Sequence, residues 1–157
     1  MDFTRAYERG KDLMIFNPLS EVRYRYRLAM EHLERAEKLF MLRDWVGVVS
    51  ASQLAIENFA KAVIAVFEVP TWSHDPSNQL DSLINRLLRN VTDEARELAN
   101  LAREVAPEHG RSTYGEPSSG LVPSDIYREE HALNALENSR KARRIAERIL
   151  NSLDVKF

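Results

Sequence analysis

Residues 44–69 form the stretch that most constrains what this chain can fold into. Of these 26 residues, 17 are apolar, and the apolar positions lie on nearly every side of a helix. Such a helix is wrapped by neighbouring elements rather than laid on a surface. Gln53, Glu57 and Lys61 follow one another at i, i+4 and i+8 and therefore share one face. The sequence predicts a central buried helix that carries one polar stripe.

Helix start and stop signals surround this stretch. Asn17 followed by Pro18 favours a helix start, and apolar residues then recur at helical spacing to about residue 42. Asp44 is expected to cap the central helix, and Pro70 is expected to end it. The segment 70–79 is interpreted as a loop.

The second half of the chain repeats these signals. A helix is expected after Asp75, with its apolar stripe over residues 80–88. Thr92 is expected to cap the next helix, which Pro107 stops. Residues 107–124 contain three Pro and three Gly, which predicts a long irregular connection of the kind that often carries function. Ser124 is expected to cap a last helix that runs to about Leu153.

These patterns predict an all-α fold. No segment alternates apolar and polar residues for long, and no Asn-Gly or Asp-Gly hairpin signal occurs. We expect an antiparallel, up-and-down bundle of four to five main helices, with a short N-terminal helix or arm over residues 2–15. With 157 residues, the chain is interpreted as one domain spanning 1–157, with a core of about 18–153 and an N-terminal extension over 1–16.

Composition excludes several classes of site. The net charge of -2 gives no overall attraction to nucleic acid, so such binding would need a local patch. With no Cys, the chain has no disulfide, thiolate metal site or thiol nucleophile. The N-terminus lacks an apolar signal region, and the longest apolar run of the central stretch, 62–67, is far short of the ~20 residues of a membrane span. We expect a cytoplasmic protein without a membrane partner.

Metal and cofactor motifs are missing from the sequence. A di-iron bundle places Glu three residues before His, and none of the four histidines has Glu at that position. There is also no His-Glu-x-x-His, no Gly-x-Ser-x-Gly and no Walker-type loop. The sequence therefore predicts neither a metal site nor a cofactor.

The remaining chemical constellation is Arg103, His109, Arg111 and Tyr114. Arg is a permanent, bidentate phosphate ligand, and His exchanges protons near neutral pH. Together they could cleave a phosphodiester without a metal, while Tyr114 stacks on a base. The alternative is that Arg103 pairs with a surface acid and His109 is merely exposed.

Two further groups of residues have both a functional and a structural interpretation. His74 is either a surface residue beside the capping Asp75 or a partner of the polar stripe. Near the C-terminus, a row of cations either follows a phosphate backbone or forms a solvated helix face. The row comprises Arg140, Lys141, Arg143, Arg144 and Arg148.

Three landmarks then occur in order along the chain. The central helix contains SASQLAIENFAKAVIAVF, SHDPSNQLDSLI follows it, and GRSTYGE and VPSDIY precede the last helix. Over roughly residues 20–152 this order resembles the HEPN superfamily, the higher eukaryotes and prokaryotes nucleotide-binding domain. The matching positions are Gln53, Ala55, Ile56, Glu57, Lys61, His74, Asp75, Leu83, Arg111, Tyr114 and Tyr127.

The resemblance implies a helical bundle that commonly forms a homodimer and binds RNA or a nucleotide. Many members are metal-independent ribonucleases with an Arg-x(4–6)-His motif, which here corresponds to Arg103 and His109. It implies catalytic roles for these two residues and Arg111, and RNA- or nucleotide-binding roles for Tyr114, Lys61 and His74. Gln53, Glu57, Asp75 and Tyr127 are then structural signature positions. Other members are non-catalytic partners of a minimal nucleotidyltransferase in toxin–antitoxin pairs, and a purely structural dimerising bundle is a third hypothesis.

Overall fold

The computed structural model describes residues 17–87 and 89–157. The helix or arm predicted over residues 2–15 lies outside the described residues, as does Leu88 of the predicted apolar stripe. The described part is α-helical and has no strand, apart from an isolated bridge between Glu116 and Leu121. The all-α prediction is confirmed.

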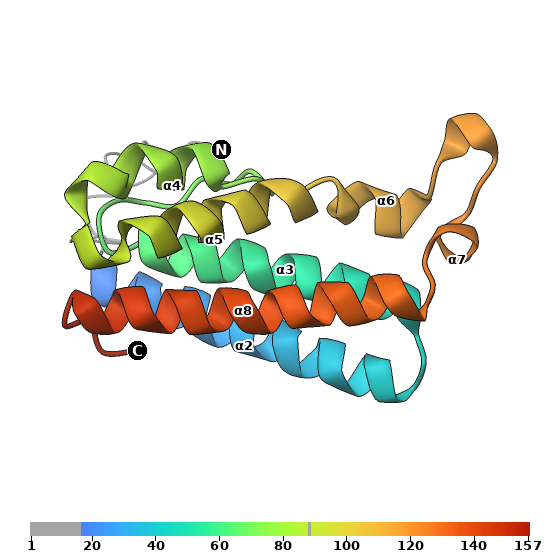
Figure 1. The fold of residues 1–157 in the computed structure, drawn as a ribbon, viewed down its shortest axis with the longest axis horizontal. Coiled ribbons are helices and arrows are strands. Elements are labelled where there is room, and N and C mark those ends of the chain that lie inside the picture. The colour runs from blue at the N-terminus through green and yellow to red at the C-terminus, as the bar shows by residue number, and fades with distance from the viewer. Residues whose placement is uncertain (1–16, 88) are drawn as a thin grey trace, which may run out of the picture.

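Four long helices build the bundle, and they alternate in direction along the chain (Figure 1). They are α2 (Pro18–Met41), α3 (Trp45–Ile64), α5 (Thr92–Val105) and α8 (Glu129–Ser152). Shorter α-helices stand between the long ones along the chain: α4 (Ser77–Leu83), α6 (Glu108–Tyr114) and α7 (Pro123–Ile126). The predicted up-and-down arrangement is confirmed. A tight turn joins α2 to α3, whereas the longer α3–α5 and α5–α8 connections contain the shorter helices.

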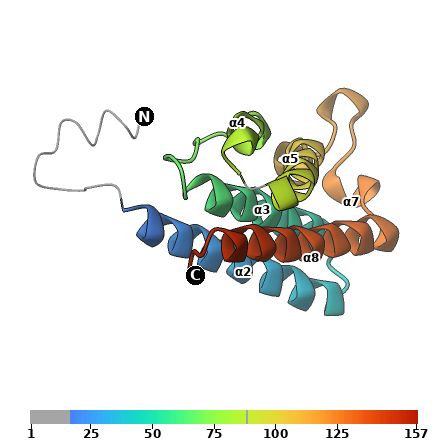
Figure 2. The same cartoon turned by 60° about the vertical axis from the view of Figure 1, so that its left-hand side comes forward.

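Helix α3 lies at the centre of the bundle. It packs against α2 and α8 on one side and against α4, α5 and α6 on the other (Figure 2). Of its 20 residues, 15 are buried, including every residue from Ala55 to Ile64. The wrapped helix predicted within residues 44–69 is therefore confirmed, because each face of α3 meets another helix. Its predicted end at Pro70 is wrong, since α3 ends at Ile64 and the chain continues in turns.

Two of the five predicted caps are confirmed. The side chain of Asn17 accepts a hydrogen bond from the backbone N–H of Ser20, and that of Asp44 accepts one from Gly47. The predicted cap Asp75 stands one residue before Pro76, the N-cap of α4, although its side chain accepts a hydrogen bond from the backbone of Ser77. The remaining two are wrong. Thr92 is already the first residue of α5, and its hydroxyl donates back to the carbonyl of Arg89 in a preceding 3-10 turn.

The predicted cap Ser124 lies inside α7 rather than at the start of the last helix. Tyr127 has an extended backbone, with φ of -96° and ψ of 131°, and this separates α7 from α8. Helix α8 then begins at Glu129, after the N-cap residue Arg128. The sequence did not reveal this break, because no Gly or Pro marks it.

The connection over 107–124 is more ordered than its composition predicts. Pro107 ends α5 but stands directly before α6, a position that does not require a backbone N–H. Gly115 ends α6 with a φ of 70°, and a side chain there would collide with the carbonyl of Leu121. Most of the candidate residues of this region therefore lie on a helix that packs against α3.

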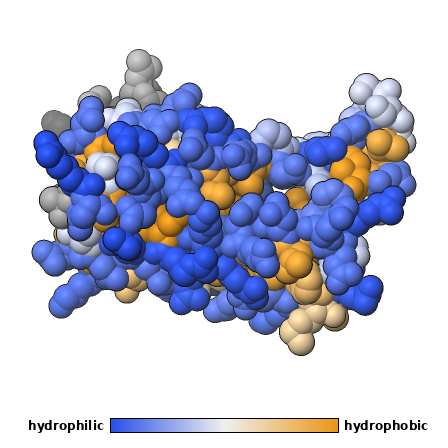
Figure 3. All heavy atoms as spheres, in the orientation of Figure 1, coloured by the Kyte–Doolittle hydropathy of each residue, from blue (hydrophilic) through white to orange (hydrophobic). Residues whose placement is uncertain are grey.

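The surface in Figure 3 is mainly hydrophilic, with hydrophobic residues in separated patches. Within the two described ranges, we find no helix with the length and apolar character needed to cross a membrane.

Candidate active site

The polar stripe of α3 is a buried, hydrogen-bonded row. The Lys61 ammonium donates to Glu57 Oε1 at 2.8 Å, and the Gln53 amide nitrogen donates to Glu57 Oε2 at 2.9 Å. Gln53, Glu57 and Lys61 are 1%, 4% and 3% exposed. The i, i+4 spacing brings these side chains together, so each supplies the partner that its buried neighbour requires.

Burial and pairing act against each other in this row. Burial raises the pKa of Glu57, but hydrogen bonds from Lys61, Gln53 and His74 outweigh it and hold that pKa below its ordinary value. Burial lowers the pKa of Lys61, and the adjacent Glu57 carboxylate offsets part of that effect. The result is an ionised carboxylate beneath the bundle surface, fixed in position by two donors of its own helix.

Two histidines from distant parts of the chain meet above this carboxylate. His74 lies between α3 and α4, and His109 lies in the first turn of α6. Their rings are stacked, with centroids 3.5 Å apart and an angle of 19° between the planes. His74 Nδ1 lies 3.2 Å from Glu57 Oε2, and His109 Nδ1 lies 3.2 Å from Gln53 Oε1.

The hydrogen-bond partners assign the tautomer of both rings. Gln53 donates its amide N–H to Glu57, so its Oε1 is the atom that faces His109 and can only accept. The carboxylate of Glu57 likewise can only accept from His74. Both histidines therefore carry a proton on Nδ1, which leaves the lone pair of a neutral ring on Nε2.

This arrangement orients two proton-exchanging groups side by side. A carboxylate or amide oxygen bound to Nδ1 fixes the ring and its tautomer, as in the best characterised acid–base histidines. We call His74 and His109 the histidine pair, and each of them is oriented to exchange a proton through Nε2.

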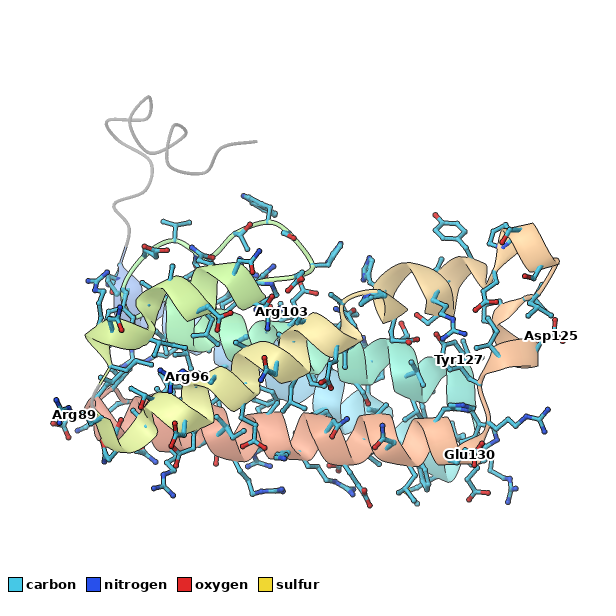
Figure 4. The ribbon with its side chains drawn as sticks, turned by 45° about the horizontal axis from the view of Figure 1, so that its top comes forward. Arg89, Arg96, Arg103, Asp125, Tyr127 and Glu130 are labelled. Atoms are coloured by element: carbon cyan, nitrogen blue, oxygen red, sulfur yellow. The ribbon has the colours of Figure 1, made fainter. Side chains whose placement is uncertain are left out.

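Among the described residues, neither predicted arginine makes a hydrogen bond or ion pair with the histidine pair. Arg103 forms an ion pair with Asp81 of α4 and donates to Asn100 at 2.8 Å. Arg111 binds Glu116 at 2.6 Å, and its guanidinium carbon lies 5.8 Å from the ring centre of Tyr127. In Figure 4, Arg103 and Tyr127 lie in separate parts of the molecule.

The remaining predicted residues divide between structural contacts and open surface. The Tyr127 hydroxyl donates to Glu108 of α6, and burial raises the pKa of Tyr127 above its ordinary value. Asp75 accepts a hydrogen bond from the backbone of Ser77 at the start of α4. Tyr114 ends α6 with 74% of its surface exposed. Among the described residues, no hydrogen bond or ion pair joins Arg103, His109, Arg111 and Tyr114 to one another.

Comparison with known families agrees with this architecture. The sequence profile of the HEPN domain matches residues 22–154. The chain belongs to the HEPN family. No curated protein and no solved structure matches the chain in the corresponding searches. Membership of this family supports a function related to nucleotides or RNA in general.

The histidine pair of this HEPN domain could not be found by spacing. His74 and His109 are separated by the whole of α4 and α5, and neither stands at a fixed interval from Glu57 on one helix. The available signal was the polar stripe itself, because a buried row on α3 requires polar neighbours. The sequence placed His74 beside that stripe in one interpretation, but it grouped His109 with the arginines.

The same geometry brings potential metal ligands together. Glu57, His74 and His109 each offer one ligand atom, and these atoms lie within 4.8 Å of one another. The sequence motifs predicted no such group, because Glu-x-x-His and His-Glu-x-x-His both place their residues at a fixed spacing on one helix. In this HEPN chain the three donors come from α3, the α3–α4 connection and α6.

Proposed function

We propose that this HEPN domain binds RNA and cleaves it without a metal ion, with the histidine pair exchanging the protons. The observation that carries the proposal is the stacking of His74 and His109 over the buried Glu57–Gln53 pair. Two oriented imidazoles are what this reaction requires, since one proton must be removed and another supplied.

In the proposed reaction, the neutral imidazole accepts the proton of a ribose 2′-hydroxyl through Nε2. The 2′-oxygen forms a bond to phosphorus, and the bond from phosphorus to the 5′-oxygen of the next nucleotide breaks. The protonated imidazole gives its Nε2 proton to that leaving oxygen. The products are a 2′,3′-cyclic phosphate and a free 5′-hydroxyl, and the pair has exchanged its protonation states.

In this proposal, the residues around the pair hold it in place. Glu57 orients His74, Gln53 orients His109, and Lys61 keeps the carboxylate ionised. Arg103 and Arg111 keep the phosphate-binding roles that the family resemblance implies, and each would have to exchange its present carboxylate partner for a phosphate. Tyr114 at the exposed end of α6 offers an aromatic ring for base stacking.

The proposal is tested by RNA cleavage in EDTA. We expect the wild-type chain to cut a single-stranded RNA and His74→Gln and His109→Gln to be slower by about 10²–10⁴-fold. Gln is of similar size and keeps a polar group near the partners, and His131→Gln is the matched control because His131 lies at the start of α8. An oligodeoxynucleotide of the same sequence should remain intact, since it lacks the 2′-hydroxyl. The proposal fails if the wild type is inert or if the histidine variants cleave as fast as the control.

The second candidate is a non-catalytic module that forms a homodimer and binds a minimal nucleotidyltransferase. The pairing of Arg103 with Asp81 and of Arg111 with Glu116 favours it, because both cations are already neutralised. Under this alternative, all the variants are equally inert towards RNA. Light scattering of the same samples, alone and with a nucleotidyltransferase encoded beside the chain, reports the dimer and the complex.

A further inference from the structure

The site beneath the histidine pair contains the donor set of a transition-metal ion. His74, His109 and Glu57 come from three different elements, and their ligand atoms lie within 4.8 Å of one another. Two imidazoles and one carboxylate are a donor set that zinc enzymes use, with a fourth position left for water. Imidazole ligands select zinc and its neighbours over magnesium and calcium, which prefer oxygen.

We propose that this chain binds one Zn²⁺ ion through His74 Nδ1, His109 Nδ1 and the Glu57 carboxylate. The two Nδ1 atoms already face the polar stripe of α3, at 3.2 Å from Glu57 Oε2 and 3.2 Å from Gln53 Oε1. The ion takes the place of the two Nδ1 protons that make those hydrogen bonds. Binding therefore starts from two Nδ1 atoms that already point towards the polar stripe.

A modest rearrangement completes the coordination. Ligand atoms around a tetrahedral zinc ion lie about 3.3 Å apart, so separations of up to 4.8 Å have to shorten. The rings must also leave their stack, because two lone pairs have to aim at one point. His74 allows this movement, since it lies outside a helix and its side chain is 51% exposed.

The surroundings hold the carboxylate ready for an ion. Glu57 receives hydrogen bonds from Gln53 and Lys61, and such partners of a ligand orient it and tune its affinity. The Lys61 ammonium balances the Glu57 charge, so the site without the ion is electrically neutral when both rings are neutral. A neutral site disfavours hard cations held mainly by charge, which is a further reason for a cation that imidazole binds well.

Zinc would also change the chemistry of the histidine pair. Coordination at both Nδ1 atoms moves each ring proton to Nε2, which removes the lone pair that faces solvent. If the pair cleaves RNA as proposed above, zinc inhibits that cleavage. This consequence rests on the proposed function, whereas zinc binding itself does not.

The experiment is calorimetric titration of the full chain with ZnCl₂, without RNA, with Co²⁺ as a spectroscopic probe. We expect one ion per chain, a tetrahedral Co²⁺ absorption band, and a loss of affinity of at least about tenfold in both His74→Gln and His109→Gln. His131→Gln is the control and should bind as the wild type does. Circular dichroism of each variant separates lost ligation from lost folding.

Zinc binding is overturned if the wild type takes up no zinc, if both histidine variants bind as tightly as the wild type, or if His131→Gln loses as much affinity. These outcomes are independent of the RNA assay, so the two proposals can fail separately. If zinc binds but RNA is not cleaved, the metal site stands and the ribonuclease proposal falls.

Discussion

Two polar rows with the same helical spacing lie in opposite environments in this molecule. Gln53, Glu57 and Lys61 on α3 are buried and bind one another. The basic row of α8 is more exposed. Arg143 binds Glu147 of the same helix, and three other members bind acids on other helices. Arg148 binds Glu94 at 3.0 Å, Arg140 binds Glu37 at 3.5 Å, and Lys141 pairs with Glu97.

The difference shows how much an i, i+4 row contributes to stability in each environment. Water screens the pairs of α8, whose basic side chains are 44–64% exposed, so each contributes little. The side chains of the α3 row are buried away from water, so each depends on its neighbours for its hydrogen bonds. The acids facing the α8 row also neutralise it, which favours a solvated helix face over a track for a phosphate backbone.

The largest effect is expected when the buried row is broken on one side. Lys61→Met leaves the Glu57 carboxylate buried without its cation, and we expect the free energy of unfolding to fall by about 3–5 kcal/mol. Urea denaturation monitored by circular dichroism measures it.

A double variant separates pairing from packing in the same row. Glu57→Leu combined with Lys61→Met removes both charges, and it should be more stable than Lys61→Met alone because no buried charge is left over. If the double variant is the less stable of the two, the unpaired Glu57 carboxylate is not what destabilises Lys61→Met.

An intermediate effect is expected at a partly buried contact between α2 and α8. The Tyr26 hydroxyl donates to Glu147, and burial, followed by that carboxylate, raises the pKa of Tyr26 to about 12. This raised pKa stabilises the folded protein fully below the unfolded-state pKa of about 10, and the contribution is lost as the pH rises through the folded-state pKa of about 12. The stability advantage of the wild type over Tyr26→Phe should therefore shrink by about 1–2 kcal/mol between pH 8 and pH 12.

Urea unfolding of both proteins at the two pH values measures this change. An advantage of equal size at pH 8 and pH 12 would show that Tyr26 does not keep its proton through its contact with Glu147.

The smallest effect is expected in the exposed row. Arg148→Ala removes the pair with Glu94, and we expect the free energy of unfolding to change by less than about 1 kcal/mol. The change should shrink further in high salt, which screens exposed charges. Thermal unfolding at low and high salt measures both. A loss comparable to that of Lys61→Met would remove the distinction between the two rows.

The sequence was most informative where a local pattern and burial agree. The apolar content of residues 44–69 predicted a wrapped helix. The i, i+4 spacing placed Glu57 and Lys61 on one face, where their side chains make a 2.8 Å contact. It was least informative at residues 107–124, where composition suggested a loop and the chain forms two short helices. Their order depends on packing against α3, which no local pattern encodes.

The sequence by itself determined an all-α bundle, its central helix and the polar stripe on that helix, because helical periodicity and caps are local properties of the chain. Only the tertiary structure decided what the stripe faces. It joined His74 to His109 across two helices and directed Arg103 and Arg111 to carboxylates elsewhere. The physical reason is that a buried carboxylate and amide bind whatever polar groups the packing of other helices brings to them, and that packing involves contacts between residues far apart in the chain.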